Sequence, residues 1–109
     1  MIVGLIGFAM VKGMQPTPYT PFAQCLTDQG AVMYGAWWCP HCKEQKETFG
    51  KAFKEVDYVE CSDSNKHLNQ VCKDAGISGF PTWKFSGGST LEGPQDLSTL
   101  AEKTNCELP

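Results

Sequence analysis

The sequence predicts one α/β domain, a sandwich in which helices pack on a central mixed sheet. A continuous apolar run at residues 31–34 is typical of a strand covered on both faces. An amphipathic segment follows, and a Gly87-Gly88 turn between two short apolar runs indicates a hairpin. Strands alternate with helices before that hairpin, which favours the α/β class.

The expected elements follow in order along the chain. Residues 22–29 predict a short helix that Gly30 ends, and the strand at 31–34 comes next. Apolar positions and one glutamine then recur at helical spacing, which predicts an amphipathic helix through Cys42, Gln45, Phe49, Phe53 and Val56. Residues 58–61 predict a second strand, and residues 66–75 predict a helix that Gly76 ends. Residues 82–85 and 89–91 form the hairpin strands, and residues 96–104 form a last helix with Asp96 as its N-cap.

Composition limits the function classes. A formal net charge of −3 over 109 residues, with no basic cluster, argues against nucleic-acid binding. Six cysteines are heavy usage for this length, and disulfides persist only in an oxidising compartment. We therefore expect a protein that acts outside the cytosol on proteins or thiols. We also expect it to be a monomer.

The N-terminal part, residues 1–20, differs from the rest. Residues 2–11 are apolar, but a bilayer span needs about 20 such residues and a signal peptide begins with positive charge. We interpret this run as the remnant of a signal anchor or the end of a transmembrane helix; a buried first strand is the alternative. Prolines at positions 16, 18 and 21 predict a stiff tether, so the folded domain is expected at residues 21–109.

The segment Cys39-Pro40-His41-Cys42 lies between the first strand and the amphipathic helix. A helix N-terminus stabilises a thiolate at Cys39, and Cys42 one turn later can attack a mixed disulfide formed there. Pro40 suits the first turn, and protonated His41 further favours a thiolate. This spacing predicts thiol–disulfide exchange without a cofactor.

Other functions of this segment stay open at this point. A structural disulfide is one. A zinc site is another, although the chain has no second Cys-x-x-Cys and no His-x-His, so we predict no metal. A third is a non-catalytic scaffold that binds partners near Pro81.

Two motifs together carry a family resemblance. Trp38-Cys39-Pro40-His41-Cys42, followed by Gly79-Phe80-Pro81-Thr82 ahead of a strand, resembles the thioredoxin fold. The resemblance implies a three-layer sandwich and a cis Phe80–Pro81 bond. It also implies that a substrate peptide binds along the backbone of Phe80 and Pro81. Trp38 adjoins the first cysteine, so we expect it to be an apolar platform for substrate, with simple core packing as the alternative.

A finer pattern comprises residues 33–46 around the two cysteines, then residues 58–61, Cys72, residues 79–83 and a closing Cys106. This pattern is similar to the thioredoxin-like domain fused to, or encoded beside, bacterial and plant homologues of vitamin K epoxide reductase. Such a domain exchanges disulfides between folding proteins and a membrane-embedded quinone reductase. This similarity implies cysteine-containing substrate proteins, a quinone-linked membrane partner and a periplasmic or thylakoid-lumen-like location, tethered to the membrane.

The direction of exchange is predicted from Met33, Pro40 and His41. Met33 aligns with the position where reductive thioredoxins carry a buried aspartate, and the Pro-His pair resembles strongly oxidising dithiol oxidases. We expect net substrate oxidation. Reduction or isomerisation is the alternative, with Pro-His as a neutral filling of the turn.

The remaining four cysteines divide by position. A Cys61–Cys72 bridge would close a short loop and contribute about 3 kcal/mol, and a Cys25–Cys106 bridge would contribute about 4–5 kcal/mol. Six cysteines permit 15 pairings, so the connectivity stays open, as does a second redox relay. Among other residues, we expect His67 to be solvated and Glu60 to be an exposed carboxylate, with a proton-handling role as its alternative.

Overall fold

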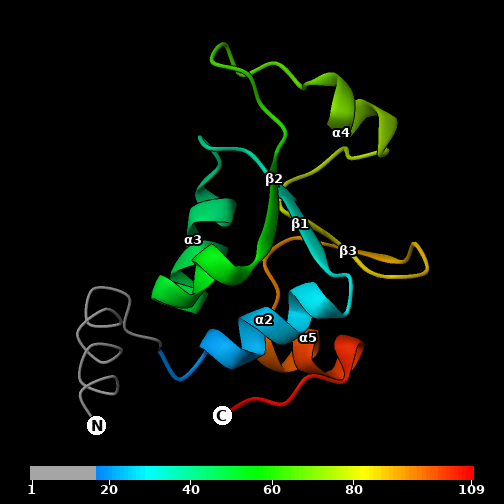
Figure 1. Ribbon diagram of the computed structural model, residues 1–109. Helices are drawn as coiled ribbons and strands as arrows, with labels where there is room; N and C mark the ends of the chain where they lie inside the picture. The colour runs from blue at the N-terminus through cyan, green and yellow to red at the C-terminus, as the bar shows by residue number, and fades with distance from the viewer. Residues whose placement is uncertain (1–16) are drawn as a thin grey trace, which may run out of the picture.

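The computed structural model describes residues 17–109, which form a four-stranded mixed sheet with helices on both faces (Figure 1). The strand order is β2-β1-β3-β4. Strand β1 (Val32–Gly35) runs parallel to β2 (Asp57–Glu60) and antiparallel to β3 (Thr82–Lys84), which pairs with β4 (Thr90–Glu92). The predicted fold class is confirmed. The expected anchor at residues 2–11 and most of the tether lie outside the described residues.

Three helices and one 3₁₀ segment gather on one face of the sheet. Helix α2 (Thr20–Asp28) lies beside α5 (Leu97–Thr104), and α3 (Pro40–Phe49) leads into η2 (Gly50–Glu55), as Figure 1 shows. Within residues 17–109, none of the helices has the length and apolar character needed to cross a membrane.

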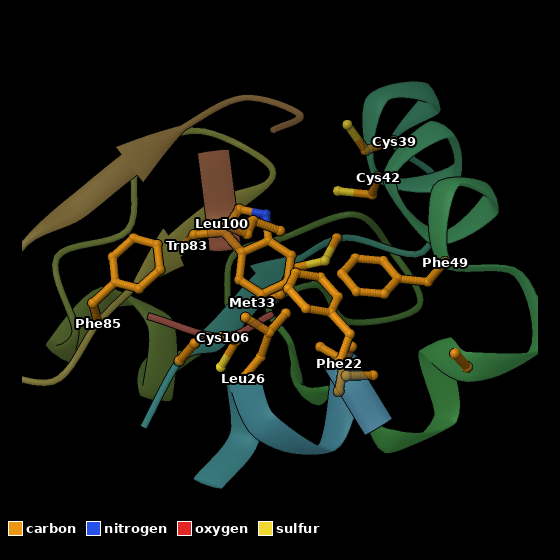
Figure 2. Close-up of a cluster of buried hydrophobic side chains, with 14 of the residues drawn as sticks. Phe22, Leu26, Met33, Cys39, Cys42, Phe49, Trp83, Phe85, Leu100 and Cys106 are labelled. Atoms are coloured by element: carbon orange, nitrogen blue, oxygen red, sulfur yellow. The ribbon is translucent and has the colours of Figure 1, made fainter. Parts of the chain in front are cut away.

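The main core lies between these helices and the sheet (Figure 2). Met33 and Trp83 project from adjacent strands and are fully buried. Phe22 from α2 stacks on Phe49 from α3 at 6.3 Å between ring centroids, and Leu100 of α5 closes the cluster. Full burial of one such side chain stabilises the fold by about 1.5–3 kcal/mol, so this cluster fixes α3 on the sheet.

The opposite face of the sheet has a smaller core. Cys61, Cys72 and Ile77 are buried there, and Tyr34 packs against them half-buried. Helix α4 (Gln70–Asp74) has only five residues and covers this face in part. Strand β1 is therefore fully covered on one face only, unlike the two-sided burial expected from its sequence.

The predicted helix at 66–75 is wrong in its first half. The Asp63 carboxylate accepts hydrogen bonds from the backbone N–H groups of Asn65 and His67, both at 2.8 Å. Lys66 has a φ of +67°, which a helix does not permit. These contacts fold residues 63–67 into a turn, so the helix begins only at Gln70.

The helix expected through Val56 also ends early. Gly50 has a φ of +60° and ends α3, after which the chain continues as the 3₁₀ segment η2. Asp96 occupies the predicted N-cap position of α5, but among the described residues its side chain makes no capping hydrogen bond. Helix propensity therefore predicted the positions of α3 and α5, but it did not predict where α3 ends or how α5 is capped.

Candidate active site at the start of helix α3

The Cys39-Pro40-His41-Cys42 segment forms the first turn of α3. Cys39 is the N-cap residue in an extended conformation, and Pro40 follows in the first turn, where its missing N–H costs no hydrogen bond. No side chain among residues 17–109 caps this helix. The Cys39 sulfur therefore lies at the positive end of the helix dipole, with no competing capping group there.

The two cysteines, both free thiols, differ in access. Cys39 is 7% exposed, whereas Cys42 is fully buried beneath it and accepts a long contact from the Ala36 N–H at 3.5 Å. Burial raises the pKa of the Cys42 thiol to about 11, against the lowering effect of the Ala36 N–H. Only Cys39 is open to an attacking thiol.

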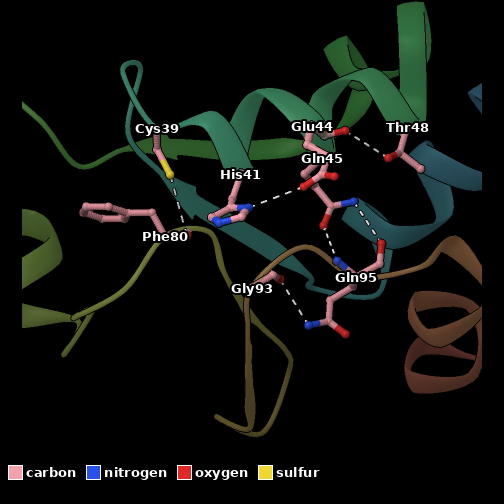
Figure 3. A network of polar contacts seen from close by, with 8 residues as sticks. All are labelled: Cys39, His41, Glu44, Gln45, Thr48, Phe80, Gly93 and Gln95. Carbon is pink, nitrogen blue, oxygen red and sulfur yellow. Dashed lines mark hydrogen bonds and ion pairs between the residues drawn. The ribbon is translucent and has the colours of Figure 1, made fainter.

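The loop that carries Pro81 faces the first cysteine. The Phe80–Pro81 bond is cis, as predicted. The Cys39 thiol donates a long hydrogen bond to the Phe80 carbonyl oxygen, with 3.8 Å between sulfur and oxygen (Figure 3). Phe80 also meets Trp38 edge to face, at 5.9 Å between ring centroids. The structure thus brings together Trp38, Cys39, Phe80 and Pro81, the residues expected to hold substrate.

A groove of about 260 Å³ continues from this cluster. Trp38 and Phe80 form its apolar side, and Lys66 and His67 from the turn before α4 form its polar side. Trp38 is fixed in it because its indole N–H donates to the Ser62 hydroxyl at 2.8 Å. His67 has a side chain that is 76% exposed, in keeping with the solvated histidine that we expected.

His41 points along α3 toward solvent. Its side chain is 68% exposed, and its Nδ1 atom lies 3.4 Å from the Glu44 carboxylate one turn later (Figure 3). The imidazole of His41 therefore lies beside the Glu44 carboxylate, in the first turn of α3 that Cys39 caps.

Glu60 is not the exposed carboxylate that the sequence suggested. It is half-buried and accepts hydrogen bonds from the Tyr58 hydroxyl at 2.9 Å, the Trp37 N–H at 3.0 Å and the Ser62 N–H at 3.1 Å. It thereby ties the end of β2 to the residues just before Cys39. Sequence reasoning missed these contacts because they join three separate segments.

Gln45 is a second residue whose role the sequence did not show. It is fully buried, and its side-chain oxygen accepts from the Trp83 indole N–H at 3.0 Å and from the Gln95 N–H at 2.6 Å. Its amide N–H₂ group donates to the Gln95 carbonyl oxygen at 3.0 Å (Figure 3). A satisfied buried amide of this kind fixes α3 against β3.

The other cysteines form two disulfides. Cys25 in α2 is bonded to Cys106 after α5, and Cys61 after β2 is bonded to Cys72 in α4. These are the two pairings expected from the sequence. Among residues 17–109, no three potential metal ligands cluster together, and the cysteines that a zinc site would need are in these bonds.

Comparison with known proteins places this site in a family. The thioredoxin family model matches residues 17–105. The chain belongs to the thioredoxin family. Thiol-disulfide oxidoreductase LTO1 of Arabidopsis thaliana is 47% identical over 98 residues, which cover 84% of this chain and 26% of LTO1.

Two further proteins are similar. Probable protein disulfide-isomerase A6 of Medicago sativa is 37% identical over 92 residues, covering 73% of this chain and 25% of that protein. A solved structure of Plasmodium falciparum thioredoxin is 24% identical, with a TM-score of 0.48, and the match covers 79% of this chain and 92% of that one. The chain spans about a quarter of the length of the two curated relatives. Their names agree with the predicted enzyme class, thiol–disulfide oxidoreductase.

Proposed function

We propose that this thioredoxin-family domain exchanges disulfides with cysteine-containing proteins, using Cys39 as the nucleophile and Cys42 as the resolving cysteine. One observation carries the proposal: the Cys39 sulfur lies at the uncapped start of α3 against the Phe80 carbonyl, with Cys42 buried behind it. An incoming sulfur meets Cys39 first, and an extended substrate segment lies beside Pro81.

The exchange proceeds in two displacements. A substrate thiolate attacks Cys39 in the Cys39–Cys42 disulfide, the bond between the two cysteines breaks, and Cys42 leaves with the electron pair. A second substrate thiolate attacks the substrate sulfur of this mixed disulfide and releases Cys39 as a thiolate. The substrate has then lost two electrons to the protein, which is left as a dithiol.

The proposed direction is net oxidation of substrates. Met33 is fully buried beneath the site and supplies no acid there, and His41 places an ionisable group one residue from the helix start. A stabilised Cys39 thiolate favours the reduced form of the protein, which makes its disulfide a stronger oxidant.

Glutathione equilibration of the Cys39–Cys42 pair tests this direction. We expect a potential of about −180 to −120 mV, less negative than the value of about −270 mV for a reductive thioredoxin. His41→Gly should make the disulfide a weaker oxidant, by about 30 mV for each tenfold change in the equilibrium constant. The matched control is His67→Gly, the other histidine, which should leave the potential unchanged.

A wild-type potential at or below the thioredoxin value would refute oxidation and leave a reductase. A potential at the isomerase end of the range, together with reactivation of scrambled ribonuclease, would favour isomerisation. The similarity to proteins named disulfide isomerases supports keeping this second candidate.

The proposed setting is an oxidising compartment next to a membrane. Two bonded cysteine pairs support this setting because such bonds are rare in the cytosol. The sequence pattern around Cys39 supports reoxidation by a quinone-linked membrane oxidoreductase similar to vitamin K epoxide reductase homologues.

Trapping tests this partner. In cells that express the full chain with Cys42→Ser, a mixed disulfide at Cys39 can no longer be resolved by Cys42 and accumulates. We expect a reducible adduct with a membrane protein in the membrane fraction. A Cys39→Ser/Cys42→Ser chain is the control, and adducts only with cytosolic proteins would contradict the proposed setting.

A further inference from the structure

The buried thiol of Cys42 needs a proton acceptor, and neither Cys39 nor Met33 can act as one. Cys42 must lose a proton before it attacks Cys39, and it gains one when it leaves the Cys39–Cys42 disulfide. Its environment opposes ionisation, because the thiol is fully buried. Met33, the residue in the strand beneath it, cannot carry a proton.

A phenol approaches the Cys42 thiol across Gly35. Strand β1 pairs with β2 so that Met33 lies opposite Tyr58 and Gly35 lies opposite Glu60. A Cβ atom on Gly35 would lie 3.0 Å from Cys42 Sγ and 3.1 Å from the Tyr58 hydroxyl oxygen. The sulfur and the phenol oxygen therefore both lie beside the same point above a bare glycine, with no side chain of Gly35 between them.

The phenol is already connected to a carboxylate. The Tyr58 hydroxyl donates to one oxygen of Glu60 at 2.9 Å, and the other oxygen is held by the N–H groups of Trp37 and Ser62. Burial and the bond to Glu60 raise the pKa of Tyr58, so the phenol stays protonated at physiological pH. Its hydrogen points to Glu60, which leaves its lone pairs for the proton of Cys42.

The other charged group near this line is Lys46 of α3. Its ammonium nitrogen lies 4.4 Å from the centre of the Tyr58 ring, and its charge lowers the pKa of Cys42. An ammonium group has no lone pair, so Lys46 stabilises the thiolate without accepting its proton. In the described part of the chain, Cys39, Lys46 and Tyr58 are the titratable groups that act on Cys42, and Glu60 acts on Tyr58.

We propose that Tyr58 and Glu60 form a proton relay that serves Cys42. When a substrate disulfide has been captured at Cys39, the Cys42 proton passes to the Tyr58 oxygen, and the Tyr58 proton passes to Glu60. The Cys42 thiolate then attacks Cys39, the bond from Cys39 to the substrate breaks, and the substrate sulfur leaves with the electron pair. Glu60 returns its proton to the leaving thiolate or to water.

The same relay works in the oxidising direction. A substrate thiol loses its proton to Glu60, directly or through water, and the resulting thiolate attacks Cys39. Cys42 leaves the disulfide while Tyr58 delivers a proton to it, and Glu60 passes the proton that it took up to Tyr58. A thiol with a raised pKa is a poor leaving group as a thiolate, so this protonation lowers the barrier. The inference rests on the proposed exchange function but not on its net direction.

The test separates the two chemical steps with 5,5′-dithiobis(2-nitrobenzoate). The dithiol protein releases one nitrothiobenzoate when Cys39 attacks the reagent and a second when Cys42 resolves the adduct. The second phase, followed by stopped flow from pH 5 to 9, reports on Cys42 alone. We compare wild type with Tyr58→Phe and Glu60→Gln. The matched controls are Tyr34→Phe, on the opposite face of β1, and Asp57→Asn, at the exposed start of β2.

We expect Tyr58→Phe and Glu60→Gln each to slow the second phase at pH 7 by about a hundredfold, the lower end of what general acid–base catalysis contributes. The residual rate should rise tenfold per pH unit, since hydroxide then takes the proton. The first phase and both controls should stay within twofold of wild type. A merely structural defect at Tyr58 or Glu60 would slow both phases and leave the pH profile unchanged in shape.

Second phases within twofold of wild type in both variants would overturn the relay, as would an equal slowing in Tyr34→Phe. If Tyr58→Phe does not fold, Glu60→Gln alone decides, because it retains the phenol and its packing against Lys46. A wild-type protein that releases only one equivalent, or none, would instead refute the proposed exchange function.

Discussion

Helices α3 and α4 each carry a cysteine in the first turn, but the two cysteines have different chemical roles. In each, a fully buried cysteine is the third residue, Cys42 in α3 and Cys72 in α4. The N-cap of α3 is Cys39, whereas the N-cap of α4 is Asn69. The start of α3 thus holds both cysteines of the dithiol. The start of α4 holds one cysteine of a disulfide, and the other, Cys61, directly follows strand β2.

The N-cap residue makes the difference. The Asn69 side chain accepts from the Cys72 N–H at 3.2 Å and donates to the Glu60 carbonyl oxygen at 2.7 Å. It satisfies the start of α4 and fastens it to β2. The Cys39 side chain turns instead to the Phe80 carbonyl. Leaving a helix start without a capping side chain keeps its dipole available for a thiolate.

Access separates the two cysteine pairs as well. Both sulfurs of the Cys61–Cys72 bond belong to fully buried residues in a small apolar core with Ile77. Cys39 keeps a 7% exposed surface next to the groove at Trp38. A thiol can therefore reach Cys39 without unfolding any part of the domain, which is not true of Cys61 or Cys72.

The largest expected effect is on turnover. Cys39→Ser should reduce disulfide exchange with a dithiol peptide to the uncatalysed rate, because a serine hydroxyl forms no mixed disulfide. The Cys61→Ala/Cys72→Ala double variant should retain exchange, measured at a temperature where it stays folded. Loss of turnover in the folded double variant would show that this second pair is a redox relay.

The two thiols of the active pair should differ in reactivity by orders of magnitude. With a pKa of about 11, Cys42 is ionised in about one molecule in ten thousand at pH 7. Iodoacetamide at pH 7 should therefore label Cys39 first, and Cys42 labelling should rise only as the pH approaches 11 or when the protein is unfolded. Peptide mass mapping after timed quenching measures this, and labelling of Cys42 first would reverse the assigned roles.

The structural bonds should differ in their contribution to stability. The Cys25–Cys106 bond closes a separation of 81 residues, and the Cys61–Cys72 bond closes one of 11. The chain-entropy model gives losses of about 4–5 kcal/mol and about 3 kcal/mol when each is removed. Urea unfolding of the two Ala/Ala double variants tests this order, and a greater loss from the shorter loop would contradict it.

The sequence was sufficient where function depends on local spacing. Cys39 and Cys42 lie within one helical turn, and Phe80-Pro81 directly precedes a strand, so both motifs could be placed before any contact was known. The α/β class followed because strands alternate with helices up to residue 76 and the Gly87-Gly88 turn marks a hairpin.

The sequence was insufficient where distant segments meet. Glu60 is held by Trp37, which is 23 residues away, and Gln45 is held by Gln95, which is 50 residues away. Neither contact leaves a periodic signal in the sequence. The turn at 63–67 was missed for a different reason, since the Asp63 carboxylate binds the backbone N–H groups that a helix would otherwise use.

The smallest expected effect is on the two N-caps themselves. Asn69→Ala should destabilise the protein by about 1 kcal/mol, because the Cys72 N–H loses its acceptor. At α3 a capping side chain can be introduced instead of removed, because within residues 17–109 Cys39 makes no capping hydrogen bond. Cys39 has the extended backbone that an N-cap needs, and serine is a preferred N-cap residue, so Cys39→Ser should be more stable than Cys39→Ala by about 1 kcal/mol.

Both Cys39 variants lack the active disulfide and leave Cys42 free, so their difference isolates the cap. Urea unfolding under non-reducing conditions keeps the Cys25–Cys106 and Cys61–Cys72 bonds intact and measures that difference directly. Equal stability of the two variants would mean that the start of α3 gains nothing from a capping hydroxyl. If serine is the more stable residue, then cysteine at the start of α3 lowers stability in exchange for a reactive sulfur.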